Sequence, residues 1–395
     1  MTDLVIRNAR VMTCDPARPG LGMIDHGALV IAGGKIAWIG DDAEAPSAGY
    51  TIDARGRLVT PGLVDCHTHA IFAGDRANEF AMRAAGTPYL EIAAAGGGIH
   101  ATLEPTRGAA DDTLVELTRE RIACARANGT TVIEIKSGYD LTNAGELRLL
   151  RCIARAAVVA GPRIVPTLLA HLIPADRAVD RDVYVRSICD QLVRAAATER
   201  LATSVDVYCD EGAFTLAETR AILTTAKACG LAVRGHVGQF RDLGAAELLG
   251  ELGARSADHV EQISDDGIAA LARAGVVAVM LPGACVQLRL PVPPVDKLRH
   301  AGVPLAVATD LNPGSSYSES LPLQLWLATT HYGMTVEEAW LGVTRHAARA
   351  LGVEAGRLVT GAAGDVVLWK CNDPADVPYH YGANHVDRVW IAGVL

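Results

Sequence analysis

The sequence lacks several features that mark whole classes of protein. It has no run of about 18 apolar residues, the length that a membrane-spanning helix requires. It has no long basic tract, and its net charge of -9 argues against nonspecific nucleic-acid binding as the main role. Its first residues show no basic region followed by a long apolar run, so no secretory leader is expected. We therefore expect neither a membrane nor a nucleic acid among its partners.

The sequence also shows no cysteine spacing that indicates disulfide bonds, and it has few aromatic residues. The nine cysteines are scattered and never spaced as Cys-x-x-Cys, a usage typical of a reducing compartment. Aromatic residues make up 5% of the chain, whereas hydrophobic residues as a whole make up 50%. A core of Ala, Val, Leu and Gly is typical of a packed α/β protein rather than of a disordered chain. The sequence thus predicts a soluble, cytoplasmic α/β protein.

The middle of the chain alternates short apolar segments with Ala-rich helical stretches, which indicates a parallel sheet. Eight such units over roughly 280 residues predict a closed (β/α)8 barrel of the TIM type. An open doubly wound sheet is the alternative, but no Gly-x-Gly-x-x-Gly follows the first strand. The expected strands are Leu63–Cys66, Thr131–Lys136, Ile164–Ala170, Val205–Cys209, Ala232–His236, Ala257–His259, Val276–Leu281 and Leu305–Thr309.

Both ends of the chain have the texture of short strands joined by tight turns. Neither end alone holds enough strands to bury a face, so we expect both to contribute to one smaller domain, a β-sandwich. We assign residues 1–59 and 352–395 to this domain and residues 60–351 to the barrel. Its expected strands are Leu4–Val11, Gly27–Ile31, Lys35–Ile39, residues 51–59, Asp365–Trp369 and Val386–Val394.

His67 and His69 follow the first expected barrel strand, in the run Pro61-Gly62-Leu63-Val64-Asp65-Cys66-His67-Thr68-His69. Alternate side chains of an extended segment face the same way, so the two imidazoles project together. Two imidazoles on one face form half of a divalent-metal site. Alone this spacing is a modest signal, because two surface histidines would give the same pattern.

The other expected strand ends supply further ligands, since functional residues of such barrels sit at the C-terminal ends of the strands. A hydrolytic metal needs three or four protein ligands and an open position for water. Asp310 could also accept a proton from water and pass it to a leaving nitrogen. His259 could polarise a scissile carbonyl. The candidate metal ligands are His67, His69, His236 and Asp310, and the candidate catalytic residues are Asp310, His259 and His171.

This arrangement resembles the amidohydrolase superfamily, which carries Pro-Gly-x-x-Asp-x-His-x-His, later strand-end histidines and a final aspartate. Longer motifs are similar to those of the imidazolonepropionase family, whose members act in histidine degradation. The similarity runs nearly from end to end. The motifs are Phe72-Ala73-Gly74-Asp75-Arg76, Gly96-Gly97-Gly98-Ile99, Glu134-Ile135-Lys136-Ser137-Gly138-Tyr139, Ser256-Ala257-Asp258-His259 and Thr309-Asp310-Leu311-Asn312-Pro313-Gly314-Ser315.

The resemblance implies a metal-dependent hydrolase that opens a cyclic amide. The substrate would be the small anionic heterocycle 4-imidazolone-5-propionate and the product N-formimidoyl-L-glutamate. It also implies a homodimer and one zinc or iron ion per chain, held by the four candidate ligands. Arg76 would bind the propionate carboxylate with its bidentate fork. The implied substrate contacts are Arg76, Tyr139, His171, Gln239, Asn312, Gly314 and Ser315.

Some positions depart from the family pattern and leave alternatives open. The family shows an acidic residue shortly after the strand-5 histidine, where this chain has His236-Val237-Gly238-Gln239. A related ring such as another imidazolone or a hydantoin, or deamination of a nucleobase, therefore stays possible, as does a metal-free binding protein. Lys136 lies on the second strand rather than the fourth, so we expect it to form an ion pair with Glu134 or Glu211 and not to bridge two metals.

Overall fold

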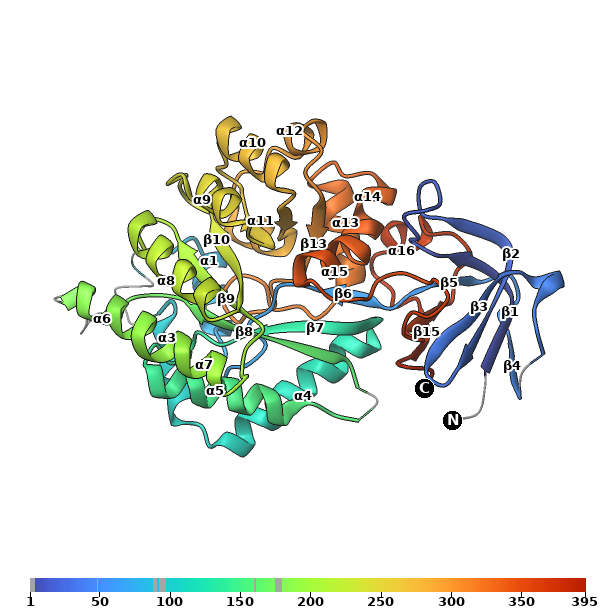
Figure 1. Cartoon of the computed structure of the whole chain (residues 1–395), viewed down its shortest axis with the longest axis horizontal. Coiled ribbons are helices and arrows are strands. Elements are labelled where there is room, and N and C mark those ends of the chain that lie inside the picture. The colour runs from blue at the N-terminus through green and yellow to red at the C-terminus, as the bar shows by residue number, and fades with distance from the viewer. Residues whose placement is uncertain (1–3, 48, 88–90, 92–96, 160, 175–179) are drawn as a thin grey trace.

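The computed structural model describes residues 4–47, 49–87, 91, 97–159, 161–174 and 180–395. Within them the chain forms a helix-covered barrel and a separate sheet at one side, and Figure 1 shows the described N- and C-terminal segments both at that sheet. Gly96, which opens one of the motifs above, lies outside the described residues.

All eight predicted barrel strands are present, each within two residues of its expected ends. They are parallel and follow chain order around the barrel. Their bounds are β6 (Leu63–Asp65), β7 (Thr130–Lys136), β8 (Arg163–Ala170), β9 (Ser204–Cys209), β10 (Ala232–Val237), β11 (Ser256–His259), β12 (Val277–Met280) and β13 (Leu305–Val307).

The barrel closes just beyond the ends of its first and last strands. The backbone N–H of Asp310 donates to the carbonyl of His67 at 3.0 Å, and the N–H of His69 donates to the carbonyl of Leu311 at 2.8 Å. Thr68 and Leu311 form a parallel bridge between these bonds. The segments that carry the candidate ligands therefore complete the barrel at its C-terminal edge.

Helices pack around the outside of the barrel, as Figure 1 shows. Local signals set several of their ends: Thr215 and Glu218 form a capping box at the start of α8, and Gly275 in the left-handed conformation ends α10. The described part of the chain holds no helix long and apolar enough to cross a membrane.

The helices are α1 (Ala77–Ala84), α3 (His100–Gly108), α4 (Asp111–Ala127), α5 (Asn143–Ala156), α6 (Arg181–Ser187), α7 (Val193–Thr198), α8 (Leu216–Ala228), α9 (Ala245–Leu252), α10 (Asp265–Ala274), α11 (Pro282–Leu288), α12 (Val295–His300), α13 (Leu321–Thr330), α14 (Val336–Gly342), α15 (Arg345–Leu351) and α16 (Asp376–Tyr379). A π-helical turn, η3 (Ile188–Leu192), joins α6 to α7, and a 3-10 turn, η1 (Asp42–Glu44), follows β3.

The second domain combines strands from both termini, as predicted, around its own apolar cluster. In place of the two sheets of a sandwich, its described strands form one hydrogen-bonded sheet. The strand β1 links them: it pairs with β2, with a register shift between Ile6 and Ala9, while its first part also pairs with β4 and its last part with β5. The strands are β1 (Leu4–Met12), β2 (Met23–Ala32), β3 (Lys35–Asp41), β4 (Tyr50–Asp53), β5 (Leu58–Pro61), β14 (Val366–Trp369) and β15 (Val386–Trp390).

Gly62 joins the two parts of the molecule, because β5 belongs to the small sheet and β6 begins the barrel directly after it. The backbone passes so close to β7 that a Cβ on Gly62 would lie 2.1 Å from Oγ1 of Thr131. Only glycine fits this crossing. The division of domains at residues 59/60 and 351/352 stays a prediction.

Replacing Gly62 with alanine should destabilise the protein by about 1–3 kcal/mol, since either β7 or the crossing segment must shift. The midpoint of thermal unfolding measures this loss. Gly108→Ala is the matched control, because a Cβ there meets nothing within 4 Å, and its midpoint should hold or rise. Equal midpoints for wild type and Gly62→Ala would contradict the packing argument.

Candidate active site

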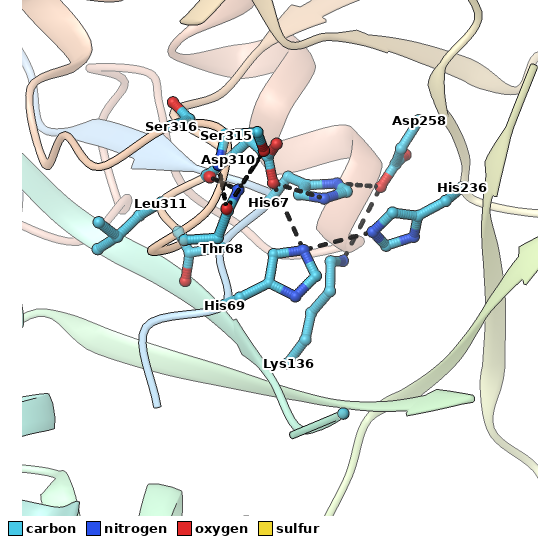
Figure 2. Close-up of polar contacts among 12 residues, drawn as sticks. His67, Thr68, His69, Lys136, His236, Asp258, Asp310, Leu311, Ser315 and Ser316 are labelled. Carbon is cyan, nitrogen blue, oxygen red and sulfur yellow. Dashed lines mark hydrogen bonds and ion pairs between the residues drawn. The ribbon is translucent and has the colours of Figure 1, made fainter. Parts of the chain in front are cut away.

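The four predicted metal ligands converge at the C-terminal edge of the barrel (Figure 2). Nε2 of His67 and Nε2 of His69 lie 3.5 Å and 3.4 Å from Oδ1 of Asp310. Nε2 of His236 lies 3.4 Å from Nε2 of His69. All four residues are buried. The structure therefore brings together residues as far apart in the sequence as His67 and Asp310.

This geometry fits a metal ion. Ligand atoms held at about 2.0–2.1 Å from a tetrahedral metal lie roughly 3.4 Å from one another, which matches the separations above. Nε2 of His67 is buried and has no hydrogen-bond partner among the described residues, as expected for an atom directed at a metal. Ligand atoms of His67, His69 and Asp310 lie within 4.8 Å of one another, as do those of His67, His236 and His259.

Buried carboxylates hold the far side of two imidazoles. Oδ2 of Asp258 lies 2.7 Å from Nδ1 of His67, and Oδ1 of Asp206 lies 2.9 Å from Nδ1 of His236. An Nδ1–H that donates to a carboxylate leaves the Nε2 lone pair available to a metal. The carboxylate of Asp65, on β6, contacts neither imidazole nitrogen and accepts from the backbone N–H and hydroxyl of Thr309.

Two buried cations balance these carboxylates. Nζ of Lys136 lies 2.8 Å from Oε1 of Glu134 and 2.9 Å from Oδ2 of Asp206. Arg234 reaches both Glu134, at 3.2 Å, and Asp258, at 3.0 Å. The expected Lys136–Glu134 pair is thus present. The sequence reasoning missed Arg234 and Asp206, although charged residues inside otherwise apolar strands are an available signal.

His259 stands beside the ligand cluster on a strained turn. It and Val260 have φ angles of 81° and 61°, which are unusual for residues other than glycine and most unusual for a β-branched one. The turn brings Oε1 of Glu261 to 3.4 Å from Nδ1 of His259. Burial opposes protonation of His259, but the carboxylates around it, Glu261 first and then Asp310 and Asp258, outweigh burial and raise the pKa of the imidazole.

The loop after Asp310 is folded by the Asn312 side chain. Its Oδ1 accepts from the backbone N–H groups of Gly314 and Ser315, both at 2.8 Å, and its Nδ2 donates to the carbonyl of Asp310 at 2.7 Å. The Asn312 side chain therefore holds the conformation of this loop. Arg76 packs across Gly314 so closely that a Cβ there would lie 2.1 Å from its Nη1.

A cavity of about 740 Å³ opens over the ligand cluster. Arg76 lines this cavity, and its Nη2 lies 2.7 Å from Oε2 of Glu79. Both side chains are largely buried. Tyr208, which the sequence reasoning missed, also lines it and donates to Oε1 of Gln239 at 2.9 Å. All the predicted substrate contacts line this cavity, namely Arg76, Tyr139, His171, Gln239, Asn312, Gly314 and Ser315.

Two comparisons place this architecture among known proteins. The profile of the amidohydrolase family matches residues 58–395. Among solved structures, a triazine hydrolase from Arthobacter aurescens superposes with a TM-score of 0.74 at 17% identity, over 100% of this chain and 94% of that one. An adenosine deaminase from Xanthomonas campestris superposes with a TM-score of 0.71 at 18% identity, over 100% of this chain and 92% of that one. At these identities the structures share the fold alone.

The chain therefore belongs to the amidohydrolase family. Within it the similarity to curated sequences is closer. The imidazolonepropionase of Rhizorhabdus wittichii is 46% identical over 98% of both chains, and that of Acidiphilium cryptum is 46% identical over 99% of both. The imidazolonepropionase of Salmonella schwarzengrund is 45% identical over 97% of this chain and 95% of its own. The chain thus falls in the imidazolonepropionase branch of the family.

Replacing Asp258 with asparagine should weaken metal binding about 10- to 100-fold, because the neutral amide holds the His67 imidazole less firmly in its metal-binding tautomer. Competition with a chelator measures the affinity. Asp387→Asn, at a surface pair with Arg57, is the control and should bind metal as the wild type does. An unchanged affinity in Asp258→Asn would show that the buried carboxylate has no part in metal binding.

The stability of the metal-free protein should fall as the pH drops from about 6.5 towards 4. Burial lowers the pKa of His69 to about 3 and those of His171 and His236 to about 4, whereas an unfolded chain titrates its histidines near 6.5. The unfolded state therefore binds more protons in this window, which favours unfolding. Thermal midpoints in chelator across this range measure the effect.

His171→Phe should flatten this pH dependence, whereas His300→Gln, at an exposed position, should leave it unchanged. A thermal midpoint of the wild type that stays constant between pH 6.5 and 4 would contradict the claim that these buried histidines are neutral in the folded protein.

Proposed function

We propose that the chain hydrolyses the ring amide of 4-imidazolone-5-propionate to give N-formimidoyl-L-glutamate, a step of histidine degradation. The observation that carries this proposal is the convergence of three imidazoles and Asp310 next to a cavity that His69, His236 and Asp310 line together with arginines. The curated imidazolonepropionases, at 45–46% identity over nearly the whole chain, support it.

His67, His69, His236 and Asp310 would hold one zinc or iron ion per chain. Such an ion supplies Lewis acidity and makes water acidic enough to attack at neutral pH. The chain's part is to present three Nε2 atoms and one carboxylate oxygen in a fixed cluster, with Asp258 and Asp206 holding two of the imidazoles from behind.

Asp310 would manage the proton during the reaction. Water adds to the ring carbonyl carbon, and the bond from that carbon to the ring nitrogen breaks when the nitrogen gains a proton. Burial raises the pKa of Asp310 above its ordinary value, which suits a carboxylate that accepts the proton of water and returns it to the nitrogen.

His259 and His171 would act on the substrate. His259, whose pKa the nearby carboxylate of Glu261 raises, would donate to the carbonyl oxygen as negative charge develops there. His171 would bind the ring from the opposite wall, together with Tyr139 and Gln239, all of which line the cavity. Burial raises the pKa of the Tyr139 phenol, which therefore stays a neutral hydrogen-bond donor.

We further propose that the enzyme works as a homodimer in the cytoplasm. Both follow from the resemblance to the imidazolonepropionase family and from the use of cysteine, since the nine cysteines are free thiols. Nucleobase deamination is the weaker alternative, because Gln239 stands where a carboxylate would be needed to move protons.

The direct test is to add freshly made imidazolonepropionate to purified protein of known metal content and to follow the loss of its ultraviolet absorbance. Rapid loss, with N-formimidoyl-L-glutamate as product, supports the proposal. No loss in metal-loaded protein overturns it, and ammonia release from a nucleobase panel would then favour the deaminase.

Asp310→Ala should lower turnover at least 10²- to 10⁴-fold, because a metal ligand and the proton carrier are lost together. The absorbance assay measures this loss, and circular dichroism checks that the barrel is still folded. Asp387→Asn, remote from the site, serves as the control. A folded Asp310→Ala variant with wild-type turnover would refute the assignment.

A further inference from the structure

His69 is held differently from the other two histidines of the candidate metal site. Buried carboxylates accept from Nδ1 of His67 and from Nδ1 of His236. Nδ1 of His69 is also buried, but among the described residues it has no hydrogen-bond partner. A ligand imidazole is normally oriented by a hydrogen bond to its second nitrogen. The placement of His69 therefore depends on the backbone that carries it.

Arg121 binds the backbone that follows His69. It lies on α4, the helix that leads into β7, and β7 pairs with β6. Nη1 of Arg121 donates to the carbonyl of Ala70 at 2.9 Å and to the carbonyl of Phe72 at 2.8 Å. The N–H of His69 itself donates to the carbonyl of Leu311. The chain is thus fixed both at the ligand and directly after it.

The same guanidinium packs on a side chain of this segment. Cζ of Arg121 lies 3.5 Å from the centroid of the Phe72 ring, a favourable position for a cation. The Phe72 ring in turn contacts the ring of Tyr139, at 6.2 Å between centroids, and the ring of Tyr317, at 5.6 Å. Tyr139 lines the cavity, and Tyr317 belongs to the loop that follows Asp310. Arg121 therefore holds both the backbone and the side chain of this segment against the site.

The charge of Arg121 is costly where it lies. The residue is 6% exposed, and within the described part of the chain its guanidinium forms no ion pair with a carboxylate. Burial lowers the pKa of Arg121, and the hydroxyl of Tyr317 opposes this shift more than any nearby carboxylate does. A buried cation destabilises the fold unless it is paired. The hydrogen bonds to the carbonyls after His69 are thus the main return for this cost.

We infer that Arg121 is a positioning residue of the candidate metal site, which keeps the imidazole of His69 directed at the other ligands by fixing the backbone after it. The inference rests on the metal site of the proposed function. Arg121 is not among the described residues that line the cavity, so it acts through His69 and not on the substrate. Carboxylates orient two of the imidazoles through their rings, and Arg121 orients the third through its main chain.

The test measures zinc affinity by competition with a chelator in Arg121→Met and Arg121→Lys. Arg121→Met keeps the buried stem but loses both hydrogen bonds, and it should bind zinc about 10- to 100-fold more weakly than wild type. Arg121→Lys keeps the charge but not the planar group over Phe72, so its affinity should fall between the two. The absorption spectrum of cobalt-loaded protein should also change in Arg121→Met, because the spectrum depends on the geometry of the ligands.

Ile122→Ala is the matched control, because Ile122 is the next residue of α4 and is buried, and its truncation removes packing alone. It should lower the midpoint of thermal unfolding but leave the zinc affinity and the cobalt spectrum unchanged. A merely structural role of Arg121 would instead make its variants behave as Ile122→Ala does. If Arg121→Met does not fold, Arg121→Lys against Ile122→Ala decides between the two roles.

The outcomes separate this inference from the proposed function. Folded Arg121 variants with the zinc affinity and cobalt spectrum of wild type overturn the inference, even if wild type hydrolyses imidazolonepropionate. Wild type that binds zinc but leaves this substrate intact overturns the proposed function, and a weaker zinc affinity in Arg121→Met still supports the role of Arg121. Wild type that binds neither zinc nor cobalt overturns both.

Discussion

The hydrogen bonds that His67 and His236 donate through Nδ1–H to buried carboxylates are the constraint on which the rest of the site depends. Asp258 and Asp206 fix His67 and His236 from inside the barrel, so that both Nε2 atoms face the same point. The two carboxylates come from β11 and β9, and the histidines from beyond β6 and from β10. An error in strand register would break these pairs. The candidate metal site therefore forms only in the correctly paired barrel.

Such carboxylates are costly to bury unless cations accompany them. Lys136 and Arg234 supply that charge to Glu134, Asp206 and Asp258. Asp310 adds a further buried carboxylate beside His67 and His69. A divalent metal ion held by these ligands would place positive charge next to it.

The sequence predicted the barrel well because local patterns encode it. Short apolar strands and Ala-rich helices alternate visibly, and the ligands stand at strand ends where the fold rule places them. It predicted less well the features that depend on contacts between residues far apart in the sequence. Nothing local to Asp65 reveals that its carboxylate contacts Thr309. The pairing of β1 with both β4 and β5, which joins the strands of an expected sandwich in one sheet, and the Arg76–Glu79 pair likewise follow only from packing.

Titration of the metal-free protein with zinc or ferrous iron tests the central claim most directly, with turnover of imidazolonepropionate and bound metal both followed. The account predicts that activity rises in proportion to metal and stops rising at one equivalent per chain, and that Asp310→Ala stays inactive throughout. Full activity without metal, or metal-loaded wild type that leaves the substrate intact, would contradict it.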